Sequence, residues 1–386
     1  MGTVIEVADI ASIAEEKLPV FLSELEHLVN IDSGTFDKAG VDAVVAVLRN
    51  RYQQLGGTVE TLHEPVQGDH LRVTFTGNGT GRILLLGHTD TVFPAGTAAE
   101  RPFRADRDRA YGPGVADMKG GDLLIVYALE ALFARGWDAF HTVTVVHNSD
   151  EEIGSPTSRE LVRSEAEHHD AVLVMEPGRE NGNIVSARKG IADCRLEVRG
   201  VASHAGVSHD RGRSAVLELA HLITGLEGLN RQVPGATLNI GRIGAGERIN
   251  IVPDYAFAHF EIRAFEANSL RAMIERAQEI VARRTVADTT ATLRADIQHF
   301  PMDKSEESSQ LVKQAQELAA QLGFAIHDVA TGGASDGNTA AQTGRPVLDG
   351  LGPVGGAAHS AGEYIELASV VPRCALLAGL LVSLGI

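Results

Sequence analysis

Three long apolar runs constrain the fold of this chain more than any other feature. They are "RILLLG" (82–87), "HTVTVVHN" (141–148) and "DAVLVMEP" (170–177). Such runs are typical of strands that are covered on both faces, usually in a parallel sheet. An amphipathic helical stretch (122–136) lies between the first two runs. The alternation predicts an α/β fold in which a mostly parallel sheet is flanked by helices.

The middle of the chain has a different pattern. The segment "ADCRLEVRG" (192–200) alternates apolar and charged residues, as a half-buried antiparallel strand does. The elements that we expect after it are helices at about 213–228 and 269–284 and strands near 236–243, 255–264 and 290–298. The order β-α-β-β-α-β is that of a ferredoxin-like α+β unit.

These patterns predict a catalytic domain in two parts, 1–185 and 297–386, interrupted by an inserted α+β domain at 186–296. A chain of 386 residues is long enough for two domains. Its net charge of −17 argues against nucleic acid as a partner, because phosphate binding needs clustered Lys and Arg.

Targeting and redox signals are weak. The first residues have no basic segment followed by an apolar one, so we expect no signal peptide. No apolar run approaches about 18 residues, so we expect no membrane span. Cys194 and Cys374 lie far apart, which argues against a disulfide framework. We expect a cytoplasmic protein, and a leader removed before this sequence begins stays an alternative.

Each apolar run leads into side chains that bind metals. The first is followed by His88 and Asp90, the second by Glu151 and Glu152, and the third contains Glu176. Positions i and i+2 of extended chain point the same way, so Asp90 can hold the ring of His88. Neighbours point to opposite sides, so one of the two glutamates can ligate a metal while the other faces a water. Ligands bind at the carboxyl ends of strands in open α/β sheets.

Two further candidates lie in glycine-rich segments, Asp117 in "YGPGVADMKGG" and His359 in "GPVGGAAHSAGEY". Adjacent acids repel by about 1 kcal/mol at 4 Å in water and about 4 kcal/mol near a protein surface. Divalent cations compensate buried carboxylates. Two His with Asp and Glu ligands suit Zn²⁺, with Mn²⁺ or Co²⁺ as alternatives. The set predicts a two-metal hydrolytic site with the metals about 3.5–4 Å apart.

The motifs "GHTDTV", "YGPGVADMKGG", "SDEEIGS", "MEP", "ASHAG" and "HSAGEY" extend from about residue 80 to the C-terminus. In this set the chain resembles the di-zinc metallopeptidases that include glutamate carboxypeptidase, aminoacylase, acetylornithine deacetylase and succinyl-diaminopimelate desuccinylase. It is most similar to the glutamate carboxypeptidase-like branch. The resemblance implies that His88 and Glu176 bind one metal, that Glu152 and His359 bind the other, and that Asp117 bridges them.

The resemblance also implies catalytic roles. Glu151 would be the general base, which takes a proton from the attacking water and passes it to the leaving amine. Asp90 would orient His88. His204, in "ASHAG", would stabilise the oxyanion, often in the site of a partner subunit, because the inserted domain of the family is both lid and dimer interface.

Four residues would meet the substrate by the same resemblance. They are Asn250, Arg263 and, in the glycine-rich loop, Gly333 and Ser335. Arg263 can grip a carboxylate bidentately, and the alternative is a salt bridge to Glu261 on the sheet face. The loop "GASDGN" departs from that of the glutamate carboxypeptidases, which puts a preference for glutamate in doubt.

The resemblance therefore predicts a dimeric di-zinc hydrolase that cleaves the amide to a C-terminal, often glutamate-like, amino acid. An N-acyl-amino-acid deacylase is the alternative within the superfamily. The substrate would be a small peptide or N-acyl amino acid, with no nucleic acid or membrane as partner.

Two other readings compete. Gly333-x-Ser335-x-Gly337 fits a nucleophile elbow, and Asp349 and His359 follow in the order of a serine hydrolase. That triad would leave the acids at the strand ends unexplained. A metal-dependent binding protein without activity is the second reading, and the presence of Glu151 argues against it.

Overall fold

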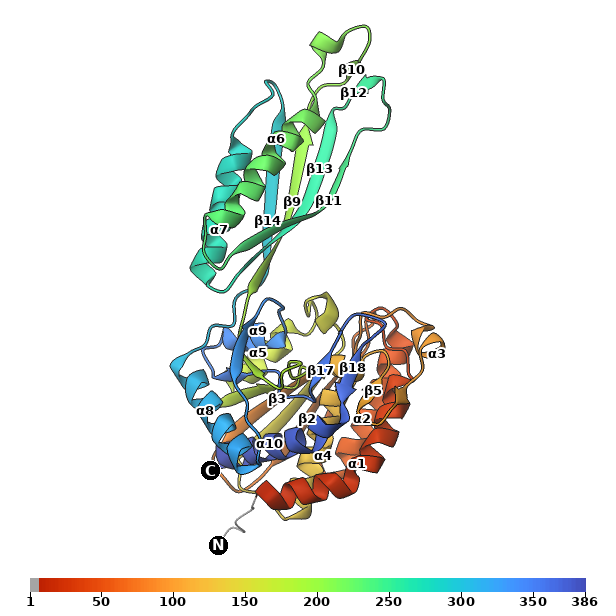
Figure 1. Ribbon diagram of the computed structural model, residues 1–386, viewed down its shortest axis with the longest axis vertical. Coiled ribbons are helices and arrows are strands. Elements are labelled where there is room, and N and C mark those ends of the chain that lie inside the picture. The colour runs from red at the N-terminus through yellow and green to blue at the C-terminus, as the bar shows by residue number, and fades with distance from the viewer. Residues whose placement is uncertain (1–6) are drawn as a thin grey trace. The chain divides into compact units, whose positions relative to one another are not determined.

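The structure is a computed structural model that describes residues 7–386, and it divides into two compact units (Figure 1). The first comprises the chain up to Ser186 together with Lys304–Ala330 and Ser335–Ile386. The second comprises Ala187–Asp303 and Thr331–Ala334. Each unit has a hydrophobic core of its own, so the second is an insertion that packs around its own centre.

The first unit is built on a six-stranded sheet in the order β1-β2-β6-β3-β7-β16. The strands are β1 (Thr58–Leu62), β2 (His70–Thr76), β3 (Arg82–His88), β6 (Thr142–Asn148), β7 (Ala171–Val174) and β16 (Val347–Leu348). The four strands from β6 to β16 are parallel, and β2 runs antiparallel to both of its neighbours, β1 and β6. His88 pairs in register with Asn148, so β3 and β6 end at the same edge.

The central strands are buried on both faces, which explains their continuous apolar sequence. In β3, Ile83 and Leu85 belong to the main core, whereas Leu84 and Leu86 are equally buried outside that cluster. Alternate side chains of a strand point to opposite faces. Helices α4 (Gly120–Ala134) and α10 (Leu367–Gly385) contact β3, as does α5 (Arg159–Glu167) (Figure 1). Burial of each such side chain stabilises the fold by about 1.5–3 kcal/mol.

The remaining helices of this unit are α1 (Val7–Val29), α2 (Lys38–Gln54), α3 (Thr97–Glu100), α8 (Glu306–Gln321) and α9 (Asp336–Ala341). Side-chain caps fix where α2 and α8 begin. Asp37 accepts the N–H of Gly40 before α2, and Ser305 accepts the N–H of Ser308 before α8.

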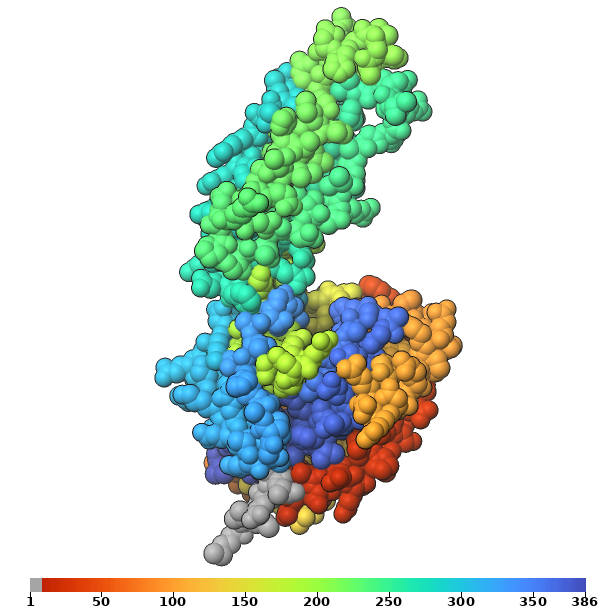
Figure 2. Space-filling model, viewed as in Figure 1, coloured from red at the N-terminus to blue at the C-terminus, as the bar shows by residue number. Residues whose placement is uncertain are grey.

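A small sheet joins segments that are far apart in the sequence. It has the order β17-β18-β5-β4 and consists of β17 (Gly355–Gly356), β18 (Tyr364–Glu366), β5 (Arg109–Tyr111) and β4 (Arg104–Ala105). In Figure 2 the orange segment near residue 105 lies beside the blue segment near residue 360. The pairing brings the loop between β17 and β18 next to the turn that follows β5.

The expectation that no apolar run approaches the length of a membrane span is wrong for α10. This helix is long and apolar enough to cross a membrane by length and composition alone. More than half of it is buried inside the fold, where it packs against α1 and α4. A core helix of a globular domain passes the same test, so α10 is weak evidence for a membrane span.

The second unit is a four-stranded antiparallel sheet in the order β11-β13-β9-β14, with two helices (Figure 1). In chain order its elements are β9 (Gly190–Arg199), α6 (Ala215–Glu227), β11 (Thr237–Ala245), β13 (Tyr255–Ala264), α7 (Ala267–Ala282) and β14 (Thr290–His299). A short pair, β10 (Ser203–His204) and β12 (Ile251–Val252), is added to it. Cys194, Leu196 and Val198 of β9 face the core with α6 and α7, and the alternate residues face solvent.

Two short strands, β8 (Ile184–Arg188) and β15 (Asp328–Thr331), lie where the chain passes between the units.

Candidate metal centre

Asp117 lies between two imidazole rings. Its Oδ1 is 3.1 Å from Nε2 of His88, and its Oδ2 is 3.1 Å from Nε2 of His359. His88 ends β3, Asp117 lies in the turn Val115–Lys119 after β5, and His359 lies in the loop between β17 and β18. The peptide bond between Asp117 and Met118 is cis.

Each histidine also faces a glutamate. Glu176 Oε1 is 3.6 Å from Nε2 of His88, and Glu152 Oε2 is 3.2 Å from Nε2 of His359. The structure therefore brings together all five residues that the sequence analysis assigns to metal binding. They form two groups, each with one imidazole and one glutamate, and the two groups share Asp117.

The residues present fit a pair of divalent cations. Glu152 Oε1 is buried and has no hydrogen-bond partner among the described residues. The ion pairs that the structure describes for Asp117 and Glu152 involve only histidines. Donor atoms of His88, Asp117 and Glu152 lie within 4.8 Å of one another. Imidazole nitrogens and carboxylate oxygens are the ligands of Zn²⁺ sites.

The acids of the cluster favour the protonated form of both histidines. Burial lowers the pKa of His88, but its hydrogen bonds with Asp117 and Asp90 outweigh burial and hold the pKa well above its ordinary value. Hydrogen bonds with Asp117 and Glu152 raise the pKa of His359 to about 10. Because a histidine binds metal only as the neutral ring, metal binding would release these protons.

Asp90 is fully buried and holds several parts of the cluster together. Nδ1 of His88 is 3.0 Å from the backbone oxygen of Asp90 and 3.4 Å from its Oδ1. The carboxylate accepts the backbone N–H groups of Glu151 and Glu152, each at 3.2 Å, and the hydroxyl of Thr35 at 2.7 Å. Asp90 thus fixes both the ring of His88 and the turn that carries the two glutamates.

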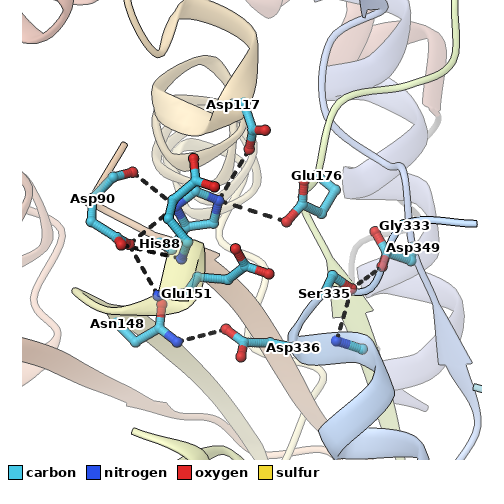
Figure 3. Close-up of polar contacts among 12 residues, drawn as sticks. His88, Asp90, Asp117, Asn148, Glu151, Glu176, Gly333, Ser335, Asp336 and Asp349 are labelled. Carbon is cyan, nitrogen blue, oxygen red and sulfur yellow. Dashed lines mark hydrogen bonds and ion pairs between the residues drawn. The ribbon is translucent and has the colours of Figure 1, made fainter. Parts of the chain in front are cut away.

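Glu151 lies beside the ring of His88 and the carboxylate of Glu176 (Figure 3). The prediction that Glu151 and Glu152 lie in extended chain, with side chains on opposite sides, is wrong. The residues form a single helical turn, Glu151–Ile153, because Asp90 binds their N–H groups. Both carboxylates therefore reach the cluster, each within a group whose donor atoms lie within 4.8 Å of one another.

Asp150, the first of the three consecutive acids, has a structural task that the sequence did not reveal. It is buried, and its carboxylate accepts the N–H and hydroxyl groups of Thr157 and Ser158 at 2.5–3.3 Å. This fixes the turn from β6 into α5. Another residue that was missed, Asp336, is buried and accepts hydrogen bonds from Asn148 and Ser155, both at 2.6 Å (Figure 3).

Glu363 was missed as well, although it stands in the motif "HSAGEY" four residues after His359. Its buried carboxylate accepts the backbone N–H groups of Gly114, Ala116 and Asp117 at 2.8–3.2 Å. Burial raises the pKa of Glu363 to about 7, against these hydrogen bonds. The contacts tie the loop of His359 to the turn of Asp117. His359 itself has φ +62°, a left-handed conformation that costs about 1–3 kcal/mol and is typical of functional sites.

The prediction that the side chain of Ser335 contacts the substrate is wrong. Its side chain is buried, its hydroxyl donates to Asp349 at 2.6 Å, and the same oxygen accepts the N–H of Gly337 as a cap of α9. It therefore offers no hydroxyl to a substrate. The serine-hydrolase triad is also wrong, because His359 faces Asp117 and Glu152.

The other predicted substrate residues belong to the second unit. His204 and Asn250 are exposed, and Nδ1 of His204 accepts the N–H of Gly206 at 3.2 Å. Arg263 makes a bidentate salt bridge with Glu261, at 2.9 Å for both contacts, and donates to the carbonyl of Gly332 at 2.8 Å. The structure thus shows the alternative for Arg263, the salt bridge to Glu261 on the sheet face. Gly333 is exposed, and its carbonyl accepts from Arg188 at 3.1 Å.

Comparison with known proteins shows the family of the chain. The model of the peptidase family M20/M25/M40 matches residues 84–383. Carboxypeptidase G2 of Pseudomonas sp. (strain RS-16) is 31% identical over 377 residues, which cover 96% of this chain and 91% of the relative. Succinyl-diaminopimelate desuccinylase of Marinobacter nauticus is 29% identical over 365 residues, 88% of this chain and 92% of the relative. Acetylornithine deacetylase of Proteus mirabilis is 27% identical over 285 residues, 69% and 72% of the two chains.

Solved structures share the fold. Aminopeptidase PepT from Bacillus cereus superposes with a TM-score of 0.81 at 21% identity, covering 96% of this chain and 99% of the other. The M20 family metallo-carboxypeptidase Sso-CP2 from Sulfolobus solfataricus gives 0.76 at 17% identity, covering 95% and 99%. The fold is thus the mixed α/β fold of these peptidases. The chain belongs to the M20 peptidase family, whose members similar to it include a carboxypeptidase and deacylases.

Proposed function

We propose that this hydrolase uses a pair of divalent cations, Zn²⁺ or alternatively Mn²⁺ or Co²⁺, to cleave the amide between an acyl group and an amino acid with a free α-carboxylate. The observation that carries the proposal is the position of Asp117, with one oxygen toward His88 and the other toward His359. Glu176 and Glu152 complete the two groups. When bound, the cations would polarise the carbonyl and acidify a water.

Glu151 is the proposed general base. Burial raises its pKa well above the ordinary value, and the neighbouring acids Glu176, Asp336 and Glu152 raise it further, although His88 opposes them. A carboxylate with a raised pKa can take a proton from water and deliver it to a leaving amine. Asp90 is proposed to hold this turn and His88 in place.

The second unit is proposed to act as lid and dimerisation domain. Because Nδ1 of His204 accepts a hydrogen bond, the neutral ring carries its proton on Nε2, which suits a donor to an oxyanion. Asn250, Arg263 and the backbone of Gly333 are proposed substrate contacts. Arg263 would exchange Glu261 for the substrate carboxylate.

We propose a homodimer in the cytoplasm, and its mass in solution, measured by light scattering, checks the assembly.

The relatives favour two forms of this activity. Similarity to carboxypeptidase G2 favours release of a C-terminal amino acid from a peptide or acyl conjugate. Similarity to acetylornithine deacetylase favours an N-acyl-amino-acid deacylase as the second candidate. A panel of dipeptides with varied C-terminal residues and of N-acyl amino acids separates the two.

The panel should be run on the protein as purified, after chelation, and after chelation followed by Zn²⁺, Mn²⁺ or Co²⁺. We expect hydrolysis that chelation abolishes and one of these metals restores. Hydrolysis that survives complete removal of metal would contradict the proposal. Retained metal with no cleavage of any amide would instead favour a binding protein.

A further inference from the structure

An open cleft of about 510 Å³ lies next to the cluster, within the first unit. It is formed by the segment before α2, the segment before α3 and the turn after β6. The residues that line it are Gly34, Thr35, Phe36, Asp37, Thr91, Val92, Phe93, Pro94, Ala95, Glu152 and Ile153. Glu152 also faces His359 at 3.2 Å, so the cleft continues directly from the proposed metal centre.

The cleft exposes large apolar side chains from three separate segments. Phe36 is 72% exposed, Val92 41% and Ile153 40%. Single exposed apolar residues need no explanation, but three that converge beside a candidate catalytic centre point to a ligand. Burying such groups against an apolar ligand is favourable, because it removes apolar area from water.

The walls of the cleft are held by the backbone. The N–H of Thr35 donates to the carbonyl of Thr91 at 3.2 Å, and the N–H of Thr91 donates to the carbonyl of Ser33 at 2.8 Å. A Cβ on Gly34 would lie 2.3 Å from the carbonyl oxygen of Phe93, so only glycine permits this close approach. The cleft is thus a built feature of the unit and not a gap between loose loops.

The charge of the residues that line the cleft indicates which end of a substrate the cleft binds. Among the described residues that line it there is no lysine or arginine, and two are acids, Asp37 and Glu152. Arg101 lies over the ring of Phe93, 4.8 Å from its centroid, but it is not a lining residue, and it donates to the carbonyl of Ser360. The described residues of the lining therefore offer no cationic side chain to pair with a carboxylate-bearing group. Asp37 is engaged as the cap of α2.

We propose that this cleft binds the acyl side of the scissile amide and selects an uncharged, apolar acyl group, such as a benzoyl or medium-chain alkanoyl group. The inference rests on the proposed function, because the cleft is placed by its continuity with Glu152. It disfavours a dicarboxylic acyl group such as succinyl. A peptide with a free α-amine is the competing occupant, because Asp37 is an acid of the lining that would attract its ammonium group.

Binding should be measured by calorimetry on the metal-loaded Glu151→Gln variant, which retains the ligand cluster but should not consume the ligand. The probes are the N-benzoyl, N-acetyl and N-succinyl derivatives of L-glutamate and L-alanine, with the dipeptides Ala-Glu and Ala-Ala. We expect the benzoyl compound to bind about 10-fold more tightly than the acetyl compound of the same amino acid, and the succinyl compound to bind more weakly still.

Variants locate the effect in the cleft. Phe36→Ala should lower benzoyl affinity about 5–10-fold and leave acetyl affinity within about twofold, with a smaller loss for Val92→Ala. Val66→Ala is the matched control, because Val66 is 57% exposed and does not line the cleft. Equal affinities for benzoyl and acetyl compounds, tighter binding of the dipeptides, or an equal loss for all probes in Phe36→Ala would overturn the inference.

Hydrolysis of the same compounds by the unchanged protein is measured in parallel. If no amide is cleaved while benzoyl affinity depends on Phe36, the proposed function fails and the apolar cleft stands. If amides are cleaved but neither affinity nor kcat/KM depends on the acyl group, the proposed function stands and the assignment of the cleft to the acyl group fails.

Discussion

On the exposed face of the inserted sheet, acids and bases pair with each other, whereas at the ends of β3 and β6 acids face acids and histidines. Arg195 lies 2.8 Å from Glu197, and Arg294 lies 2.7 Å from Asp296. In the cluster, by contrast, a buried oxygen of Glu152 has no partner within the part of the chain that the structure describes. Exposed charges that pair within the fold are structural. A buried carboxylate oxygen without a partner indicates what must be supplied from outside.

The largest effect that should separate the two regions comes from Glu151→Gln. Turnover should fall by about 10²–10⁴-fold because the amide side chain cannot accept a proton, while bound metal per chain stays unchanged. The measurement is kcat together with elemental analysis of the purified protein. Glu160→Gln, which alters an exposed ion pair on α5, is the control and should retain full activity. Normal turnover in the Glu151 variant would remove the assigned base.

The next largest effect is expected for Asp90→Asn. The change weakens the contact that orients His88 and the acceptor for the N–H groups of Glu151 and Glu152. Metal affinity or activity should fall by about 10–100-fold. Competition with a chromogenic chelator gives the metal affinity directly. Thr35→Val removes a single hydrogen bond to Asp90 and should produce a smaller loss. An equal loss in both variants would argue against a special role for the carboxylate.

The histidines of the first unit allow a pH test of the same contrast. His88 and His359 lie among acids, which raise their pKa, whereas burial lowers the pKa of His169, whose ring contacts Thr144 and the carbonyl of Glu165. Below pH 6.5, the ordinary pKa of histidine, the ring of His169 binds a proton in the unfolded chain but stays neutral in the folded protein. The stability that His169 contributes is therefore present above that pH and lost as the pH falls through it.

Urea denaturation of the unchanged protein and of His169→Gln should be compared between about pH 7.5 and about pH 5.5. The unchanged protein should lose more stability over this range than the variant. His168→Gln is the control, because the neighbouring ring is exposed. Parallel pH profiles for the unchanged protein and the His169 variant would show that His169 does not carry the effect.

The smallest effect is expected for the paired charges of the second unit. Arg294 and Asp296 have side chains that are 79% and 50% exposed. Arg294→Ala should change the free energy of unfolding by at most about 1 kcal/mol, because water screens exposed ion pairs. Activity should be unchanged. A larger loss of stability would show that this surface depends on its charges more than the comparison allows.

The sequence predicted the parts of the site that depend on local pattern. Apolar runs mark β3, β6 and β7, and because parallel strands share an edge, His88, Glu151, Glu152 and Glu176 could be expected to meet. A glycine-rich segment marked His359 as a candidate. Its position rests on the pairing of β18 with β5, between segments far apart in the chain, and only the family resemblance assigned it to the second metal.

The errors came from residues whose role depends on partners elsewhere. A run of acids reads as one group, yet Asp150 caps a turn while its two neighbours reach the cluster. Glycine-rich segments with a serine look alike whether the serine attacks a substrate or caps a helix, and the hydrogen bond from Ser335 to Asp349 decides for the cap. Glu363 was missed because its partners are backbone N–H groups, which leave no trace in the sequence.

The central claim is that Asp117 is shared by two cations at the ends of β3 and β6. A crystal structure of the protein prepared with Zn²⁺, with anomalous differences recorded at the zinc edge, tests it most directly. The account predicts two peaks that share Asp117, one contacting His88 and Glu176 and the other contacting His359 and Glu152. The absence of any peak among these five side chains in active protein would contradict it.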